Sequence, residues 1–175
     1  MSTVQRINFE PFSNLLQTQI RDKALADPTL ANPLSAVALV DGEWMTTDAS
    51  DKAIRASAVA TPGNPATVMS FPLFAERGRT DIQAMAERKV PLIIMGDWEA
   101  DTRIFDATVV VGGGAAITTQ WQPVKVATIT LGARNYSGLV GHGGAADTAP
   151  IAGYVTRLPA ANGGKLRIMG GKGRL

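Results

Sequence analysis

The run Val124-Lys125-Val126-Ala127-Thr128-Ile129-Thr130-Leu131 decides the fold class of this chain. Its β-branched and apolar residues are typical of a β-strand. Short runs of the same kind recur at residues 90–95, 150–158 and 165–169, and glycine or proline turns separate them. Close, even spacing of short strands favours a barrel or a sandwich over alternating strand–helix units. We therefore predict a mainly β fold, a compact antiparallel β-barrel or jelly-roll-like sandwich.

Weaker signals complete the predicted set of elements. Asp41-Gly42 predicts a hairpin turn between a short buried strand at 36–40 and a returning strand at 43–46. Further predictions are strands at 66–74, 107–111 and 117–121, a short helix at 80–86 and a glycine turn at 112–114. Because residues 132–144 are rich in glycine, we expect a loop there.

The first 34 residues differ in pattern from the rest. Their apolar residues fall at roughly helical spacing, which predicts a short helix over about residues 12–25, ended by Pro28 and Pro33. We predict an N-terminal arm at 1–34 that packs on something outside its own core, and a β-rich domain at 35–175. The alternative is an ordinary N-terminal helix packed on the domain. The apolar residues are Phe9, Phe12, Leu15, Leu16 and Ile20.

Composition excludes several kinds of site. Hydrophobic residues make up 45% of the 175 residues and charged residues only 18%, so we expect an ordered core. The absence of cysteine rules out disulfides, thiol nucleophiles and thiolate metal sites, and a single histidine rules out a multi-histidine metal centre. The longest apolar run, residues 36–40, is far too short to span a bilayer. We therefore expect no contact with a membrane and synthesis in a cytoplasm.

Charge is unevenly distributed along the chain. The net charge of +2 is too small to indicate nucleic-acid binding. Residues 41–106 carry eleven acids against seven bases, whereas residues 107–175 carry one acid against seven bases. The two parts could attract each other, within one protomer or between neighbours. The alternative is that polarity simply drifts along the chain.

Three carboxylates form the first candidate site. Asp97, Glu99 and Asp101 alternate, so a strand would place all three on one face. Such a face could bind a cation or serve glycoside hydrolysis. The alternative is a solvated strand face on which Arg103 is a neutralising neighbour.

Two catalytic motifs can be drawn but lack parts. Residues 109–116 resemble the strand and glycines of a dinucleotide site, but Ile117 replaces the last small residue and no helix follows. Ser137, His142 and Asp147 could form a triad, but the sequence around the serine is not a nucleophile elbow. A glycine-rich hairpin turn and a loop histidine are the simpler interpretations. No cofactor is expected.

Four stretches of the sequence together suggest a family. They are Phe71-Pro72-Leu73-Phe74-Ala75-Glu76-Arg77-Gly78-Arg79-Thr80-Asp81-Ile82-Gln83-Ala84, Gly96-Asp97-Trp98-Glu99-Ala100-Asp101-Thr102-Arg103-Ile104-Phe105-Asp106, Gly153-Tyr154-Val155-Thr156-Arg157-Leu158-Pro159 and Asn162-Gly163-Gly164-Lys165-Leu166-Arg167-Ile168. These stretches resemble the head decoration, or cement, proteins of tailed bacteriophages, and the resemblance covers about residues 70–170. It implies a non-enzymatic, β-rich virion protein that is often trimeric and binds outside the capsid lattice.

The resemblance implies specific partners. The chain would stabilise the shell by bridging neighbouring major capsid subunits, and it would associate with itself as a homotrimer. Nucleic acid and membrane are not expected partners. The alternatives are another virion component, such as a tail-tube, head–tail connector or fibre-base protein, and a hydrolase that uses the three carboxylates. The residues expected to contact the capsid or a neighbour are Arg6, Phe9, Phe12, Leu16, Lys165 and Arg167.

Overall fold

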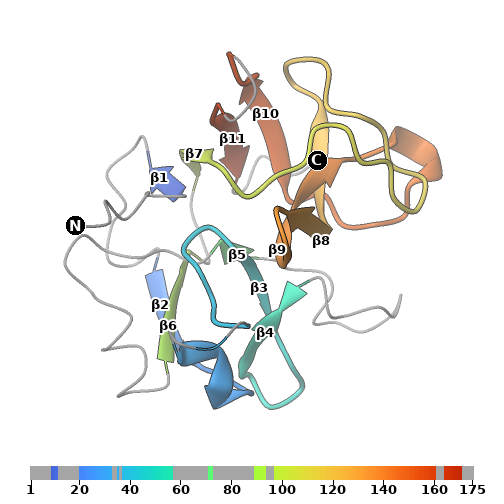
Figure 1. Ribbon diagram of the computed structural model, residues 1–175. Helices are drawn as coiled ribbons and strands as arrows, with labels where there is room; N and C mark the ends of the chain where they lie inside the picture. The colour runs from blue at the N-terminus through green and yellow to red at the C-terminus, as the bar shows by residue number, and fades with distance from the viewer. Residues whose placement is uncertain are drawn as a thin grey trace.

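The computed structural model of the chain is built mainly of antiparallel β-strands (Figure 1). It describes residues 9–11, 20–32, 35, 37–56, 71–72, 89–93, 97–160 and 164–170. All pairings between the named strands are antiparallel. The strands are β1 (Phe9–Pro11), β2 (Ile20–Ala24), β3 (Trp44–Thr47), β4 (Ala53–Arg55), β5 (Phe71–Pro72), β6 (Lys89–Ile93), β7 (Trp98–Thr102), β8 (Pro123–Leu131), β9 (Arg134–Gly141), β10 (Gly153–Arg157) and β11 (Leu166–Gly170).

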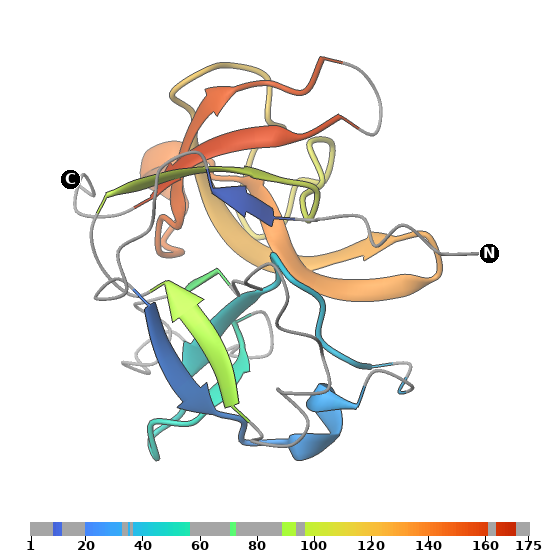
Figure 2. The same ribbon diagram turned by 90° about the vertical axis from the view of Figure 1, so that its left-hand side faces the viewer.

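The largest sheet has six strands and curls on itself. Its order is β1-β7-β11-β10-β8-β9, so β1 and β9 are the edge strands. The chain that leaves β7 crosses to the β9 edge, where Leu139 donates its N–H to the Ile104 carbonyl at 3.0 Å. The Leu139 carbonyl in turn accepts from the Asp106 N–H at 2.9 Å. These bonds draw the two ends of the sheet together into a curled half-barrel (Figures 1 and 2).

Two smaller sheets lie below the large sheet in both views. One pairs β2 with β6, and the other has the order β4-β3-β5. Two buried residues of the three-stranded unit join it to the large sheet. Trp44 packs beside Trp98 of β7, with ring centroids 6.1 Å apart. Glu43 is fully buried and accepts the N–H of Ser137 in β9 at 3.2 Å and the Arg55 Nε at 2.7 Å.

The mainly β prediction is confirmed, and several predicted strands are present. The strands predicted at 43–46, 90–95, 124–131, 150–158 and 165–169 correspond to β3, β6, β8, β10 and β11. Of the strand predicted at 66–74, β5 forms its described part. The helix predicted at 80–86 lies outside the described residues.

The loop prediction for residues 132–144 is wrong over most of its length. Residues Arg134–Gly141 form β9, which pairs with β8 along the whole strand. The glycines serve close packing here: a Cβ on Gly138 would lie 2.3 Å from Ile129 Cδ1 on β8. The turn residue Gly132 has φ of 66°, as the first central position of a type II′ hairpin turn requires.

Over their described residues, three predicted strands do not form, because side chains take the backbone groups that a neighbouring strand would use. Asp106 Oδ1 accepts the N–H groups of Thr108 and Val109, which turns the chain at 107–111. Gln122 Oε1 accepts from Thr118 and holds residues 117–121 in a turn. At 37–40 the Arg55 guanidinium binds two carbonyls, and β3 pairs with β4 and β5 instead.

The helix predicted over residues 12–25 is wrong at its C-terminal end. Residues Ile20–Ala24 form β2, in register with β6 from Ile20 opposite Ile93 to Ala24 opposite Lys89. Cross-strand pairing therefore outweighs the helical spacing of the apolar residues. Residues 12–19 lie outside the described part of the chain. Within that part, helical turns are the short 3-10 segments Pro28–Ala31 and Gly144–Ala146, and none could cross a membrane.

Candidate functional site

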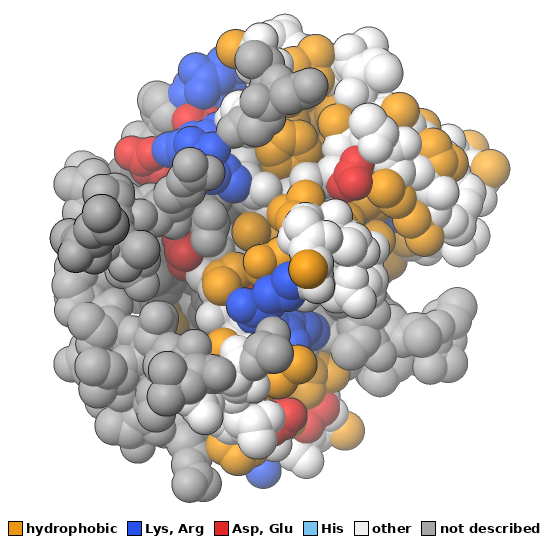
Figure 3. Space-filling model, viewed as in Figure 1, with side chains coloured by type: hydrophobic (Ala, Val, Ile, Leu, Met, Phe, Trp, Pro, Cys, Tyr) orange, Lys and Arg blue, Asp and Glu red, His pale blue; other side chains and the backbone are white. Residues whose placement is uncertain are grey.

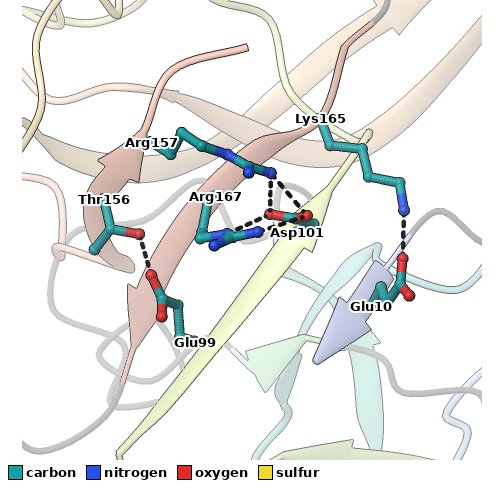
Figure 4. A network of polar contacts seen from close by, with 7 residues as sticks. All are labelled: Glu10, Glu99, Asp101, Thr156, Arg157, Lys165 and Arg167. Atoms are coloured by element: carbon teal, nitrogen blue, oxygen red, sulfur yellow. Dashed lines mark hydrogen bonds and ion pairs between the residues drawn. The ribbon is translucent and has the colours of Figure 1, made fainter. Parts of the chain in front are cut away.

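Asp101 in β7 is the centre of a polar network that ties the large sheet together (Figure 4). Its side chain is nearly buried, and two arginines approach it, one from the neighbouring strand β11 and one from β10 beyond it. Arg167 of β11 donates from Nε to Oδ1 at 2.8 Å and from Nη2 to Oδ2 at 3.3 Å. Arg157 of β10 donates from Nη2 to Oδ2 at 3.1 Å and to Oδ1 at 3.3 Å. Each carboxylate oxygen thus accepts from both arginines.

The network extends to both sides of Asp101. Glu99 Oε1 accepts from the Thr156 hydroxyl at 2.6 Å, and Lys165 forms an ion pair with Glu10 of β1 (Figure 4). Strands β1, β7, β11 and β10 are therefore linked by charge as well as by backbone pairing. The bond to Asp101 raises the pKa of Arg167 above its usual range, since it favours the charged guanidinium.

The three carboxylates that were predicted to form a site lie in different surroundings. Asp97 is exposed and Glu99 is half-buried, but Asp101 is enclosed by arginines rather than by solvent. A cation or a substrate at Asp101 would have to displace a guanidinium from it. Among the residues that the structure describes, no cluster of three or more acidic or histidine side chains is arranged to hold a metal. The geometry favours a structural role for these acids.

The residues predicted to contact the capsid fall into three groups. Lys165 and Arg167 lie in the network, each held by an acid of the same chain. Phe9 lies in β1, opposite Thr102 of β7. Arg6, Phe12 and Leu16 lie outside the described residues. The predicted attraction between the acidic and basic parts of the sequence is therefore found within one protomer, at Asp101.

The structure does not assemble the Ser137–His142–Asp147 triad that can be drawn from the sequence. Ser137 and His142 lie five residues apart on extended chain, which separates their Cα atoms by about 16 Å. His142 and Asp147 do approach, with Nε2 and Oδ1 3.9 Å apart. His142 Nδ1 accepts the Gly144 N–H at 3.1 Å, so Nε2 carries the proton and donates to the Ala149 carbonyl at 3.0 Å.

Asp147 instead pairs with Lys125 in a buried clamp. The Lys125 Nζ lies 2.6 Å from Asp147 Oδ2 and also donates to the carbonyls of Val111 and Gly112. Asp147 further accepts two backbone N–H groups. Loss of hydration would raise the pKa of Asp147, but the bonds from Lys125 and the backbone outweigh it and hold the pKa below its usual value.

The clamp fixes the glycine turn that resembled a dinucleotide site. Gly112 and Gly113 have φ of 51° and 78°, and no helix follows them. Gly143 packs against this turn so closely that a Cβ there would lie 1.7 Å from the Gly113 carbonyl oxygen. The dinucleotide interpretation is thereby replaced by a close contact between two glycine-rich turns.

The Gln122 side chain holds a second turn, which carries an exposed tryptophan. Gln122 accepts the Thr118 N–H at 2.9 Å and donates from Nε2 to the Ala116 carbonyl at 2.7 Å. Trp121, next in the turn, has φ of 63°, which costs a non-glycine residue about 1–3 kcal/mol. The residue is nevertheless 63% exposed. The sequence analysis did not single out Lys125, Gln122 or Trp121. The feature of the sequence that could have drawn attention to them is the lack of other charged residues in this part of the chain.

Comparison with known proteins does not identify the chain. No family model matches it, and searches of curated proteins and of solved structures find no significant match.

Proposed function

We propose that the chain is a non-enzymatic structural protein of a tailed-phage virion. In this proposal it binds the outside of the capsid and stabilises the shell by bridging neighbouring major capsid subunits. Its fold would be a compact barrel or jelly-roll-like sandwich, and it would act as a homotrimer. The proposal rests on the resemblance to head decoration proteins and on how the chain arranges the residues that carry it.

One observation carries the proposal. Three of the stretches that resemble decoration proteins contain β7, β10 and the first three residues of β11, and these strands lie in the large sheet in the order β7-β11-β10. Asp101, Arg157 and Arg167 come one from each strand and join all three. Asp101 is thus joined to two arginines that lie more than fifty residues away in the sequence. A unit held by internal ion pairs suits a bridging protein, which must transmit load between the subunits it contacts.

The physical basis of such a bridge is linkage. A protein that binds only the assembled lattice stabilises that state by mass action. Repetition over many equivalent sites makes modest contacts at each site sufficient. Glu10 and Asp101 hold Lys165 and Arg167 in fixed positions, so the exposed part of each side chain, 26% and 16%, would meet a capsid surface with little further loss of side-chain entropy.

The test is reconstitution on particles that lack the chain. Purified protein is added to such capsids, and both co-sedimentation and the temperature of capsid disruption are measured. We expect saturable binding and a higher disruption temperature. The variant F9S/F12S should bind more weakly while keeping its circular dichroism spectrum, and the control Val37→Ser should bind normally. Saturating protein that leaves capsid stability unchanged would contradict the bridging role.

A further inference from the structure

Residues 107–133, which lie between Asp106 and Arg134, are almost without charge. Lys125 is their one charged residue, and its side chain is 4% exposed because it lies in the clamp with Asp147. Three of the four large hydrophobic residues that are exposed in the described part of the chain lie here: Val110, Val111 and Trp121. We call the exposed residues of 107–133 the uncharged surface. The upper right of Figure 3 is mostly white and orange, and the one acidic side chain seen there comes from outside residues 107–133, which contain no acid.

This surface is prearranged rather than loose. Lys125 binds the carbonyls of Val111 and Gly112, and Gln122 binds the turn that ends at Trp121. The Trp121 N–H also donates to the Val155 carbonyl at 2.6 Å, which fixes the turn to β10. The fold therefore holds a large indole in solvent on a strained backbone. The hydrogen bonds hold the turn within one protomer, but they leave the indole as a large apolar area that a partner would cover.

The absence of charge indicates what that partner is. Around a rotation axis, residues near the axis meet the same residues of another copy, so any charge there would face its own kind. A surface that docks a different protein has no such restriction, and complementary charges commonly steer and align such partners. The rest of the chain is not short of charge, with 17 basic and 15 acidic residues in all. A region depleted of both signs therefore fits contact with itself.

We propose that the uncharged surface is the contact between copies of this chain, with Trp121 as its anchor beside the rotation axis. This inference rests on the self-association included in the proposed function, and it names the surface that carries it. The capsid-binding residues then lie elsewhere, so association of the chain and binding to particles are separate properties.

Sedimentation equilibrium of the purified full chain over a wide concentration range tests this inference. We expect concentration-dependent association, and we expect Trp121→Ala to weaken it at least about thirtyfold, as for an interface anchor. Trp121→Gly should weaken association equally while being at least as stable as Trp121→Ala, because glycine adopts this φ without strain. The control Val37→Ala removes an exposed side chain outside the surface and should associate as the wild type does.

Three results would overturn the inference. They are a wild-type chain that stays monomeric at every concentration, a folded Trp121→Ala variant that associates normally, and an equal loss in the Val37→Ala control. Particle binding, measured in parallel, separates this inference from the proposed function. If Trp121→Ala associates normally but fails to bind particles, the surface docks on the capsid instead. Association through Trp121 in a chain that no particle binds would support the contact and contradict the virion role.

Discussion

Replacing Asp101 by asparagine should destabilise the fold more than any other single change of an acid in β7. The asparagine keeps the shape of the side chain but loses its charge, and its amide would present N–H groups to a guanidinium that also donates. Arg167 is 16% exposed and cannot recover full hydration, whereas Arg157 is 51% exposed and can. Most of the loss therefore comes from the Arg167 contact.

The size of the effect follows from that difference in exposure. Breaking a fully buried pair costs about 3–5 kcal/mol, and an exposed pair contributes about 0–1 kcal/mol. We expect Asp101→Asn to lower the free energy of unfolding by about 2–4 kcal/mol. In a chain of this size that corresponds to a fall in Tm of roughly 5–15 °C. Urea unfolding followed by tryptophan fluorescence gives the free energy, and calorimetry gives the Tm.

A matched control and a coupling measurement make the prediction specific. Asp97→Asn changes an exposed acid just before the same strand and should cost less than about 1 kcal/mol. A double-mutant cycle between Asp101→Asn and Arg167→Gln should give a coupling of about 1–3 kcal/mol. Equal effects of the Asp97 and Asp101 changes, or a coupling near zero, would refute the claim that this network holds the sheet together.

Three further changes test other contacts. Glu43→Gln removes the buried acid that pairs with Arg55 and should lower the free energy of unfolding, measured in urea, by about 3–5 kcal/mol. A decrease under about 1 kcal/mol would contradict the claim that Glu43 joins the three-stranded sheet to the large sheet. The pKa of Asp147 lies below its usual value in the folded state, so the ionised carboxylate stabilises the fold above about pH 4, and this stabilisation is lost as the pH falls further. Asp147→Asn should therefore make the free energy of unfolding depend less on pH in that acid range, with no change in its pH dependence near neutrality, as measured by urea unfolding at several pH values. Gly143→Ala places a Cβ against the Gly113 carbonyl and should cost at least about 1–3 kcal/mol by thermal unfolding, and a Tm equal to that of the wild type would show that the two turns separate easily.

The sequence predicted those strands in which the apolar residues are the ones that the fold buries. Strands β6, β8 and β11 have buried residues at alternate or consecutive positions and lie where the pattern indicated. Strand β9 was missed because Gly138 and Gly141 read as loop residues. Their lack of side chains is in fact what admits Ile129 and the Ala115 carbonyl. The spatial partner of a glycine is not visible in its own sequence neighbourhood.

The false strands have a different cause. Residues 107–111 contain three consecutive valines, yet Asp106 captures the backbone of Thr108 and turns the chain. Whether such a hydrogen bond forms depends on a side chain that lies just outside the apolar run. The candidate site shows the same limit. Spacing placed Asp101 on a strand, but its arginine partners lie fifty-six and sixty-six residues away, so the pairing could be found in the structure and not in the pattern.

The measurement that tests the central claim most directly is the copy number of this chain in purified virus particles, determined by quantitative mass spectrometry against the major capsid protein. A protein that bridges capsid subunits is predicted at on the order of hundreds of copies, in a ratio to the major capsid protein of one or a simple fraction of one. About a dozen copies or fewer would assign the chain to the tail tube, the head–tail connector or the fibre base. Absence of the chain from particles would contradict a virion role.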